Sequence, residues 1–123
     1  MLEVFAQKDC GNSPKKLLLK NFYIVFVEKR IDELFLFLSE DIIWNTPKGT
    51  FQGDDQIHEL ISGAINQPVQ KLFLDQIITH GKDATVRGKF TLGEKTKYFS
   101  DFYEFQSAGS KKIKTINSYI GIL

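Results

Sequence analysis

One stretch of the sequence places a carboxyl group among aromatic side chains. Residues 98–105 read Tyr-Phe-Ser-Asp-Phe-Tyr-Glu-Phe, a pattern typical of a β-strand. Side chains alternate across a strand, so Asp101 shares a face with Phe99 and Tyr103. Burying an acid on an aromatic face costs free energy unless the acid is paired, protonated or open to a cavity. Asp101 is therefore the first candidate for a functional residue, with a buried structural carboxyl as the alternative interpretation.

The other reactive residue types give weaker leads. His58 lies beside Glu59 and His80 precedes a predicted hairpin turn, and we interpret both histidines as surface residues. The strand parity of Arg87 predicts that it points away from the face of Asp101. Cys10 is the only cysteine, which excludes an intramolecular disulfide, and we interpret it as a bystander thiol in a turn. No metal-ligand spacing or glycine-rich phosphate loop is present, so we expect neither a metal nor a cofactor.

Length and composition limit the class of protein. The chain has 123 residues, 42% of them apolar, and a formal net charge of +1. Such a balanced charge argues against nucleic-acid binding, which needs a clustered basic field. The first residues lack the pattern of a secretion signal, and no apolar run approaches the ~20 residues of a membrane span. We therefore expect a cytoplasmic protein that binds neither nucleic acid nor membranes.

Hydrophobic spacing and turn residues divide the chain into helices followed by long strands. Ser13 and Pro14 begin the first helix as a capping hydroxyl and a proline at the first helical position, and Asp54 is expected to cap the third. We assign residues 1–12 to an N-terminal extension without a core element and residues 13–123 to one domain. The expected helices are 15–29, 31–38 and 54–65, and the expected strands are 41–46, 69–80, 84–92, 96–105 and 113–122.

This order predicts an α+β fold with helices on one face of a largely antiparallel sheet. Several strands are apolar on both faces. Leu72, Leu74 and Ile78 share one parity, whereas Phe73 and Ile77 share the other. A second apolar face must also be covered, most simply by another copy of the chain. We therefore expect a homodimer that forms through the sheet face.

Several segments, in this order and spacing, resemble the nuclear transport factor 2-like superfamily, which includes ketosteroid isomerases and SnoaL-like polyketide cyclases. The opening residues 9–16 are similar to those of a small bacterial subgroup. The resemblance implies a cone-shaped, cystatin-like fold in which a strongly curved sheet wraps around the long helix and encloses a pocket. The segments that carry it are 40–44, 51–53, 79–86, 101–105 and 112–119.

The resemblance also implies which residues line the pocket. The matching positions are mostly aromatic or aliphatic with a few polar groups, a composition usual for small-molecule sites. The expected ligand is a small apolar or aromatic metabolite that carries one polar group. The implied lining is Phe22, Phe26, Trp44, Thr46, Leu60, Val86, Phe90, Asp101, Tyr103 and Ser118.

Compared with the known catalytic sets of the superfamily, this sequence is incomplete. Ketosteroid isomerases use a carboxylate base, a tyrosine on the first helix and a protonated acid. Asp101 matches the acid, but the base position holds Thr46 and the tyrosine position holds Phe22. An epoxide hydrolase-like site would need a second acid where Ser118 stands, and an arginine directed at the pocket, which Arg87 is not.

Three functions remain open. The first is ligand binding without turnover, with Asp101 hydrogen-bonded to the polar group of the ligand. The second is a SnoaL-like isomerase or cyclase that uses Asp101 as general acid or base, with its pKa raised by burial. The third is a dimeric scaffold or interaction module, whose sheet face pairs with a different protein and whose pocket is incidental.

Overall fold

The computed structural model describes residues 2–8 and 13–122. The predicted turn around Cys10 lies outside the described residues. The elements, in chain order, are β1 (Glu3–Ala6), α1 (Pro14–Val27), α2 (Ile31–Phe35), β2 (Leu38–Thr46), β3 (Gly49–Gln52), α3 (Asp54–Ala64), β4 (Val69–His80), β5 (Asp83–Leu92), β6 (Lys95–Phe105) and β7 (Ile113–Ile122).

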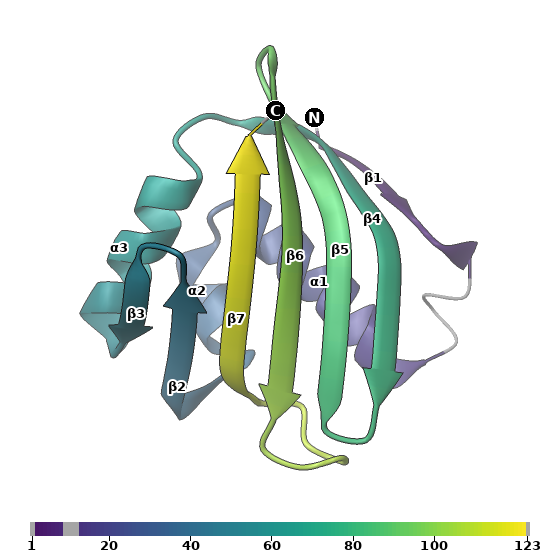
Figure 1. Ribbon diagram of the computed structural model, residues 1–123, viewed down its shortest axis with the longest axis vertical. Coiled ribbons are helices and arrows are strands. Elements are labelled where there is room, and N and C mark those ends of the chain that lie inside the picture. The colour runs from purple at the N-terminus through teal and green to yellow at the C-terminus, as the bar shows by residue number, and fades with distance from the viewer. Residues whose placement is uncertain (1, 9–12, 123) are drawn as a thin grey trace.

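Seven strands form one open, curved sheet in the order β1-β4-β5-β6-β7-β2-β3. The long strands β4 to β7 are antiparallel neighbours, whereas β1 runs parallel to β4 and β2 parallel to β7 (Figure 1). Helix α1 lies behind the long strands and α3 lies beside the β2–β3 edge. The predicted α+β fold, with helices on a curved and mostly antiparallel sheet, is confirmed.

Helix α1 supplies the centre of the core. The Ser13 side chain accepts a hydrogen bond from the Lys16 backbone nitrogen, and Pro14 occupies the first helical position, as the sequence predicted. Leu19, Phe22 and Tyr23 are buried at helical spacing, which turns one stripe of the helix toward the concave face of the sheet. Val25 and other residues on the opposite side of the helix are also buried, because α1 packs on two sides.

Three predicted boundaries were wrong. Residues 3–6 form β1, because a short edge strand needs only backbone pairing with β4 and few apolar side chains. Helix α2 ends at Phe35, and Leu38 already begins β2. The cap of α3 is Gly53, at a φ of 81°, and no side chain caps that helix.

A β-bulge changes which side chains of β4 face the core. The pairing of β4 with β5 shifts between Leu74 and Gln76, so the alternation of side chains reverses there. Ile77 is buried beside Leu74, and Ile78 is exposed on the outer face. The simple alternation that grouped Ile78 with Leu74 was therefore wrong beyond the bulge.

The helices of the described residues are all too short or too polar to cross a membrane.

Candidate functional site

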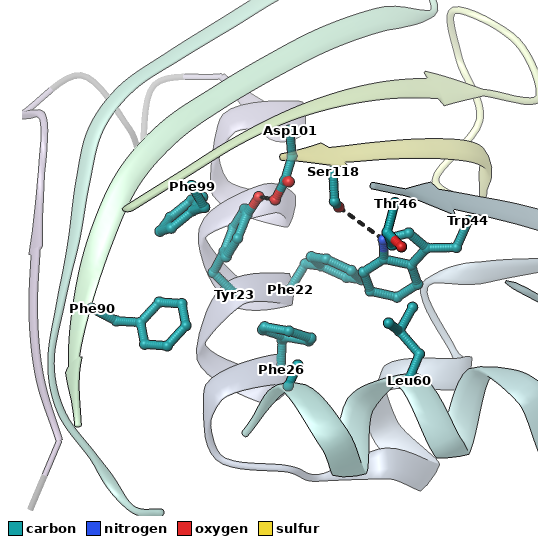
Figure 2. Close-up of a pocket in the computed structure, with 11 residues that line it drawn as sticks. Phe22, Tyr23, Phe26, Trp44, Thr46, Leu60, Phe90, Phe99, Asp101 and Ser118 are labelled. Atoms are coloured by element: carbon teal, nitrogen blue, oxygen red, sulfur yellow. Dashed lines mark hydrogen bonds between the residues drawn. The ribbon is translucent and has the colours of Figure 1, made fainter. Parts of the chain in front are cut away.

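The carboxyl of Asp101 lies at the centre of a buried hydroxyl cluster. Asp101 and Tyr23 are 5% and 2% exposed. The Tyr23 hydroxyl donates a hydrogen bond to Asp101 Oδ2 (Figure 2). The Tyr103 hydroxyl in turn donates to the Tyr23 oxygen. The Tyr103 hydroxyl also lies 3.2 Å from the same Oδ2. Two phenols from different elements, helix α1 and strand β6, thus converge on one carboxyl oxygen.

Burial controls the charge of this carboxyl. Loss of solvation raises the pKa of Asp101 from 3.8 to about 7, although Ser118, Tyr103 and the backbone of Tyr119 each pull the pKa down. Burial also raises the pKa of Tyr103 well above its ordinary value, so this phenol stays a neutral donor. Asp101 therefore releases its proton much closer to neutral pH than an exposed aspartate does.

The second oxygen of the carboxyl is unpaired. Ser118 lies directly opposite Asp101 in the β6–β7 pairing, and its hydroxyl and the Tyr119 backbone are near enough to lower the pKa of the carboxyl as hydrogen-bond donors. Even so, Asp101 Oδ1 is buried and makes no hydrogen bond of normal geometry with the residues that the structure describes. An unsatisfied buried polar atom costs about 1–3 kcal/mol. A bound molecule that engages Oδ1 would recover that free energy.

The polar groups of Trp44 and Thr46 already have hydrogen-bond partners. Trp44 Nε1 donates to Ser118 Oγ at 2.8 Å, so the buried indole has the partner that its N–H requires (Figure 2). Thr46 Oγ1 donates to the Gly49 carbonyl at 3.1 Å and accepts from the Lys48 nitrogen at 3.1 Å. Thr46 therefore stabilises the β2–β3 turn and is not available as a base.

A small cavity of about 30 Å³ adjoins the cluster. That volume has room for about two water molecules, and not for an aromatic ring. Most of the expected lining is present, but Val86 and Tyr103 are buried outside it. The residues that line this inner cavity are Phe22, Tyr23, Phe26, Trp44, Thr46, Leu60, Ala64, Phe90, Phe99, Asp101 and Ser118.

A larger groove of about 420 Å³ lies next to the inner cavity. The two share Thr46, Leu60, Ala64 and Ser118, so the groove forms the mouth of the cavity. Its volume falls within the range of about 300–1,000 Å³ that is usual for ligand sites. The walls come from α3, the β2–β3 hairpin and the first residues of β6. A ligand would thus fit as an apolar body in the groove with one small group inserted inward.

Sequence reasoning missed Tyr23, the closest partner of Asp101. It assigned the tyrosine position of the first helix to Phe22, which lines the cavity but carries no hydroxyl. The signal was present in the helical spacing, because Tyr23 lies four residues after Leu19 and three before Phe26, on the buried stripe. The first helix therefore carries a tyrosine that reaches Asp101, one residue after the compared position Phe22.

The remaining candidates lie away from the cavity. His58 and His80 are exposed, and His58 Nδ1 lies 3.4 Å from the Ser62 hydroxyl on the same helix. Arg87 is exposed and donates to Gln76 Oε1 at 3.0 Å on the outer face, as its parity predicted. Within the described part of the chain, histidines and acids form no group that could hold a metal ion.

Comparisons with known proteins identify the fold. No family model and no curated protein matches the chain. A nuclear transport factor 2-like protein of unknown function from Burkholderia xenovorans superposes with a TM-score of 0.72 at 14% identity, covering 86% of this chain and 81% of that one. A provisionally named ketosteroid isomerase from Kribbella flavida gives 0.70 at 16% identity, with coverage of 85% and 76%. A provisionally named SnoaL-like polyketide cyclase from Shewanella denitrificans gives 0.71 at 10% identity, with coverage of 89% and 92%. The chain has the nuclear transport factor 2-like fold.

Proposed function

We propose that this chain of the nuclear transport factor 2-like fold is a small-molecule-binding protein whose ligand places one carbonyl or hydroxyl group against Asp101. The observation that carries the proposal is the buried, unpaired Oδ1 of Asp101 beside the inner cavity. A protonated carboxyl donates a hydrogen bond to a carbonyl oxygen, and an ionised carboxyl accepts one from a hydroxyl. We expect the ligand to be a small apolar or aromatic metabolite of the cytoplasm.

The volumes of the inner cavity and of the groove support a ligand with a small polar end and a larger apolar body. The inner cavity admits one polar group, and the groove of about 420 Å³ accommodates the apolar remainder. Aromatic side chains such as Phe22 and Phe26 line the inner cavity, so the polar group would enter an environment of low dielectric constant. A hydrogen bond to Asp101 would be stronger there than in water.

Methyl hexyl ketone is expected to bind and to change the fluorescence of Trp44, the only tryptophan, which lines the cavity. Tyr23→Phe should weaken binding about tenfold, because it removes the hydrogen bond to Oδ2 that orients the carboxyl toward the ligand, and such a bond is worth about 1–1.5 kcal/mol. Affinity should also fall as the pH rises above about 7, because ionised Asp101 cannot donate to a ketone. Titrations from pH 5 to 9 measure both effects.

Tyr98→Phe is the control, since it removes a phenolic hydroxyl from β6, the strand of Asp101, but on the exposed face of the sheet. It should leave the dissociation constant unchanged. Equal affinities for wild type and Tyr23→Phe, or the lack of any saturable response, would contradict the proposal. The second result would favour a scaffold.

A second candidate function is proton transfer on a carbonyl-activated carbon, as in an isomerase or cyclase. The specific observation in its favour is the pKa of Asp101 near 7, the value that suits a general acid or base at neutral pH. It predicts that the protein accelerates deuterium exchange at the carbons next to the ketone in heavy water, followed by NMR. Asp101→Asn should abolish that acceleration. Exchange at the buffer rate, despite ketone binding, would leave ligand binding as the function.

We also propose that a second copy of the chain covers the outer face of the sheet. Phe102 and Tyr119 are 49% and 57% exposed and form an edge-to-face pair with ring centroids 6.3 Å apart. Exposed aromatic groups of this kind are usual at interfaces. Sedimentation equilibrium should give the mass of a dimer at tens of micromolar, and Phe102→Lys should give a monomer. A monomeric wild type at that concentration would refute the dimer.

A further inference from the structure

The mouth of the cavity carries positive charge that faces the same way as Asp101. Lys97 and Asp101 stand four residues apart on β6, so their side chains share one face of the sheet. That separation is about 13 Å along the strand. Lys97 lines the groove, whereas Asp101 lines the inner cavity. One continuous site thus has a cation at its mouth and a carboxyl at its inner end.

The charge of Lys97 is not neutralised within the groove. Its Nζ donates to the carbonyl of Ala64 at 3.2 Å, and Lys48 lines the same groove. Neither lysine has a carboxylate within salt-bridge distance in the part of the chain that the structure describes. Burial, followed by the charges of Lys48 and Lys95, lowers the pKa of Lys97, so these three cations lie within electrostatic reach of one another.

The groove contains one opposing charge. Glu59 lines it, but Glu59 is exposed and is not among the groups that shift the pKa of Lys97. The two lysines against one glutamate leave an excess of one positive charge in the lining. The apolar part of the groove comes from Pro47, Phe51 and Leu60, with the small residues of α3 between them.

The C-terminus of helix α3 near Lys97 favours one class of anionic ligand over another. Ala64 is the last residue of α3, and the C-terminus of a helix carries partial negative charge. A compact dianion such as a phosphate prefers a helix N-terminus with free backbone N–H groups. A carboxylate, with a single charge, meets less repulsion beside Ala64 and can still pair with Lys97.

We infer that the ligand of the proposed site is an amphipathic carboxylic acid. Its carboxylate pairs with Lys97 and Lys48 at the mouth, its apolar chain lies on Phe51 and Leu60, and its far end carries the carbonyl or hydroxyl that reaches Asp101. This inference rests on the proposed function, to which it adds the chemical class of the ligand.

Three eight-carbon probes distinguish binding at Lys97 from binding at Asp101. They are methyl hexyl ketone, octanoate, and an oxo acid that has the carboxylate of octanoate at one end and a methyl ketone at the other. Isothermal titration calorimetry should show that the oxo acid binds wild type about tenfold more tightly than the ketone does. Lys97→Gln keeps a donor for the Ala64 carbonyl and should abolish that advantage, measured as the ratio of the oxo acid and ketone affinities in each protein. Lys95→Gln removes an exposed lysine of the same strand that does not line the groove, and it should retain most of the advantage.

Failure of the inference is distinguishable from failure of the proposed function. If the ketone binds but the oxo acid binds no better, or Lys97→Gln leaves the ratio unchanged, the carboxylate site is refuted and the proposed function stands. If octanoate binds as tightly as the oxo acid and depends on Lys97, the carboxylate site is supported and the role of Asp101 is refuted. If none of the probes binds, both are refuted.

Discussion

Asp101→Asn is expected to be more stable than wild type at pH 8 by about 4 kcal/mol. Folding raises the pKa of this carboxyl from 3.8 to about 7. Between those values the folded state binds more protons than the unfolded state, so the free energy of unfolding falls as the pH rises. A difference of about 3 pKa units corresponds to about 4 kcal/mol, and the loss is complete above pH 7. Asparagine is neutral throughout and escapes this penalty.

Urea denaturation of wild type and Asp101→Asn at intervals from pH 4 to 8 measures the effect. The two stabilities should nearly coincide at pH 4 and separate progressively toward pH 7. Other groups contribute equally to both proteins, so the difference isolates Asp101. A wild type that is more stable than the variant at pH 8 would mean that the carboxylate is a satisfied structural charge.

Gly88→Ala is expected to destabilise the fold by more than about 4 kcal/mol and to leave little folded protein. A Cβ at this position would lie 2.0 Å from the Phe73 carbonyl oxygen and 2.8 Å from Phe99 Cζ. The nearer atom belongs to the backbone of β4 beside its bulge, so it cannot turn aside as a side chain can. Relief would require β4 and β5 to separate at the bend of the sheet.

The control for this substitution is Gly63→Ala on the exposed side of α3. A Cβ at Gly63 meets nothing within 4 Å, and alanine should stabilise the helix by about 0.5–1 kcal/mol. Thermal unfolding and soluble yield compare the two variants directly. A folded Gly88→Ala protein with a melting temperature near that of wild type would show that the sheet can bend differently here.

The fold could be predicted because turns and alternation mark the long strands clearly. Gly81 and Gly93 adopt positive φ angles of 58° and 59° in the hairpin turns that the sequence indicated. Alternation failed at β4, where the bulge after Leu74 moves Ile77 to the core and Ile78 to the surface. Both residues are isoleucine, so residue type alone does not show which of them faces the core. A bulge is set by the curvature of the whole sheet.

The candidate site could be predicted in outline from parity on β6, which places Asp101 on the inner face. Tyr23 was not predicted as a partner of Asp101, because the family resemblance assigns the tyrosine position of the first helix to Phe22. Helical spacing places both residues on the buried stripe. Lys97 was missed because its position depends on where α3 ends, at Ala64, and on how the groove closes. The size of the inner cavity was also beyond the sequence, since it depends on how closely the aromatic rings pack.

The most direct test of the Asp101 site is the ¹³C resonance of its carboxyl, assigned by comparison with Asp101→Asn and followed by NMR across pH. We expect a midpoint of about 7 in the free protein. Saturating methyl hexyl ketone should raise that midpoint, because the ketone accepts a hydrogen bond only from the protonated acid. A midpoint near 3.8, or one that the ketone leaves unchanged, would contradict the account.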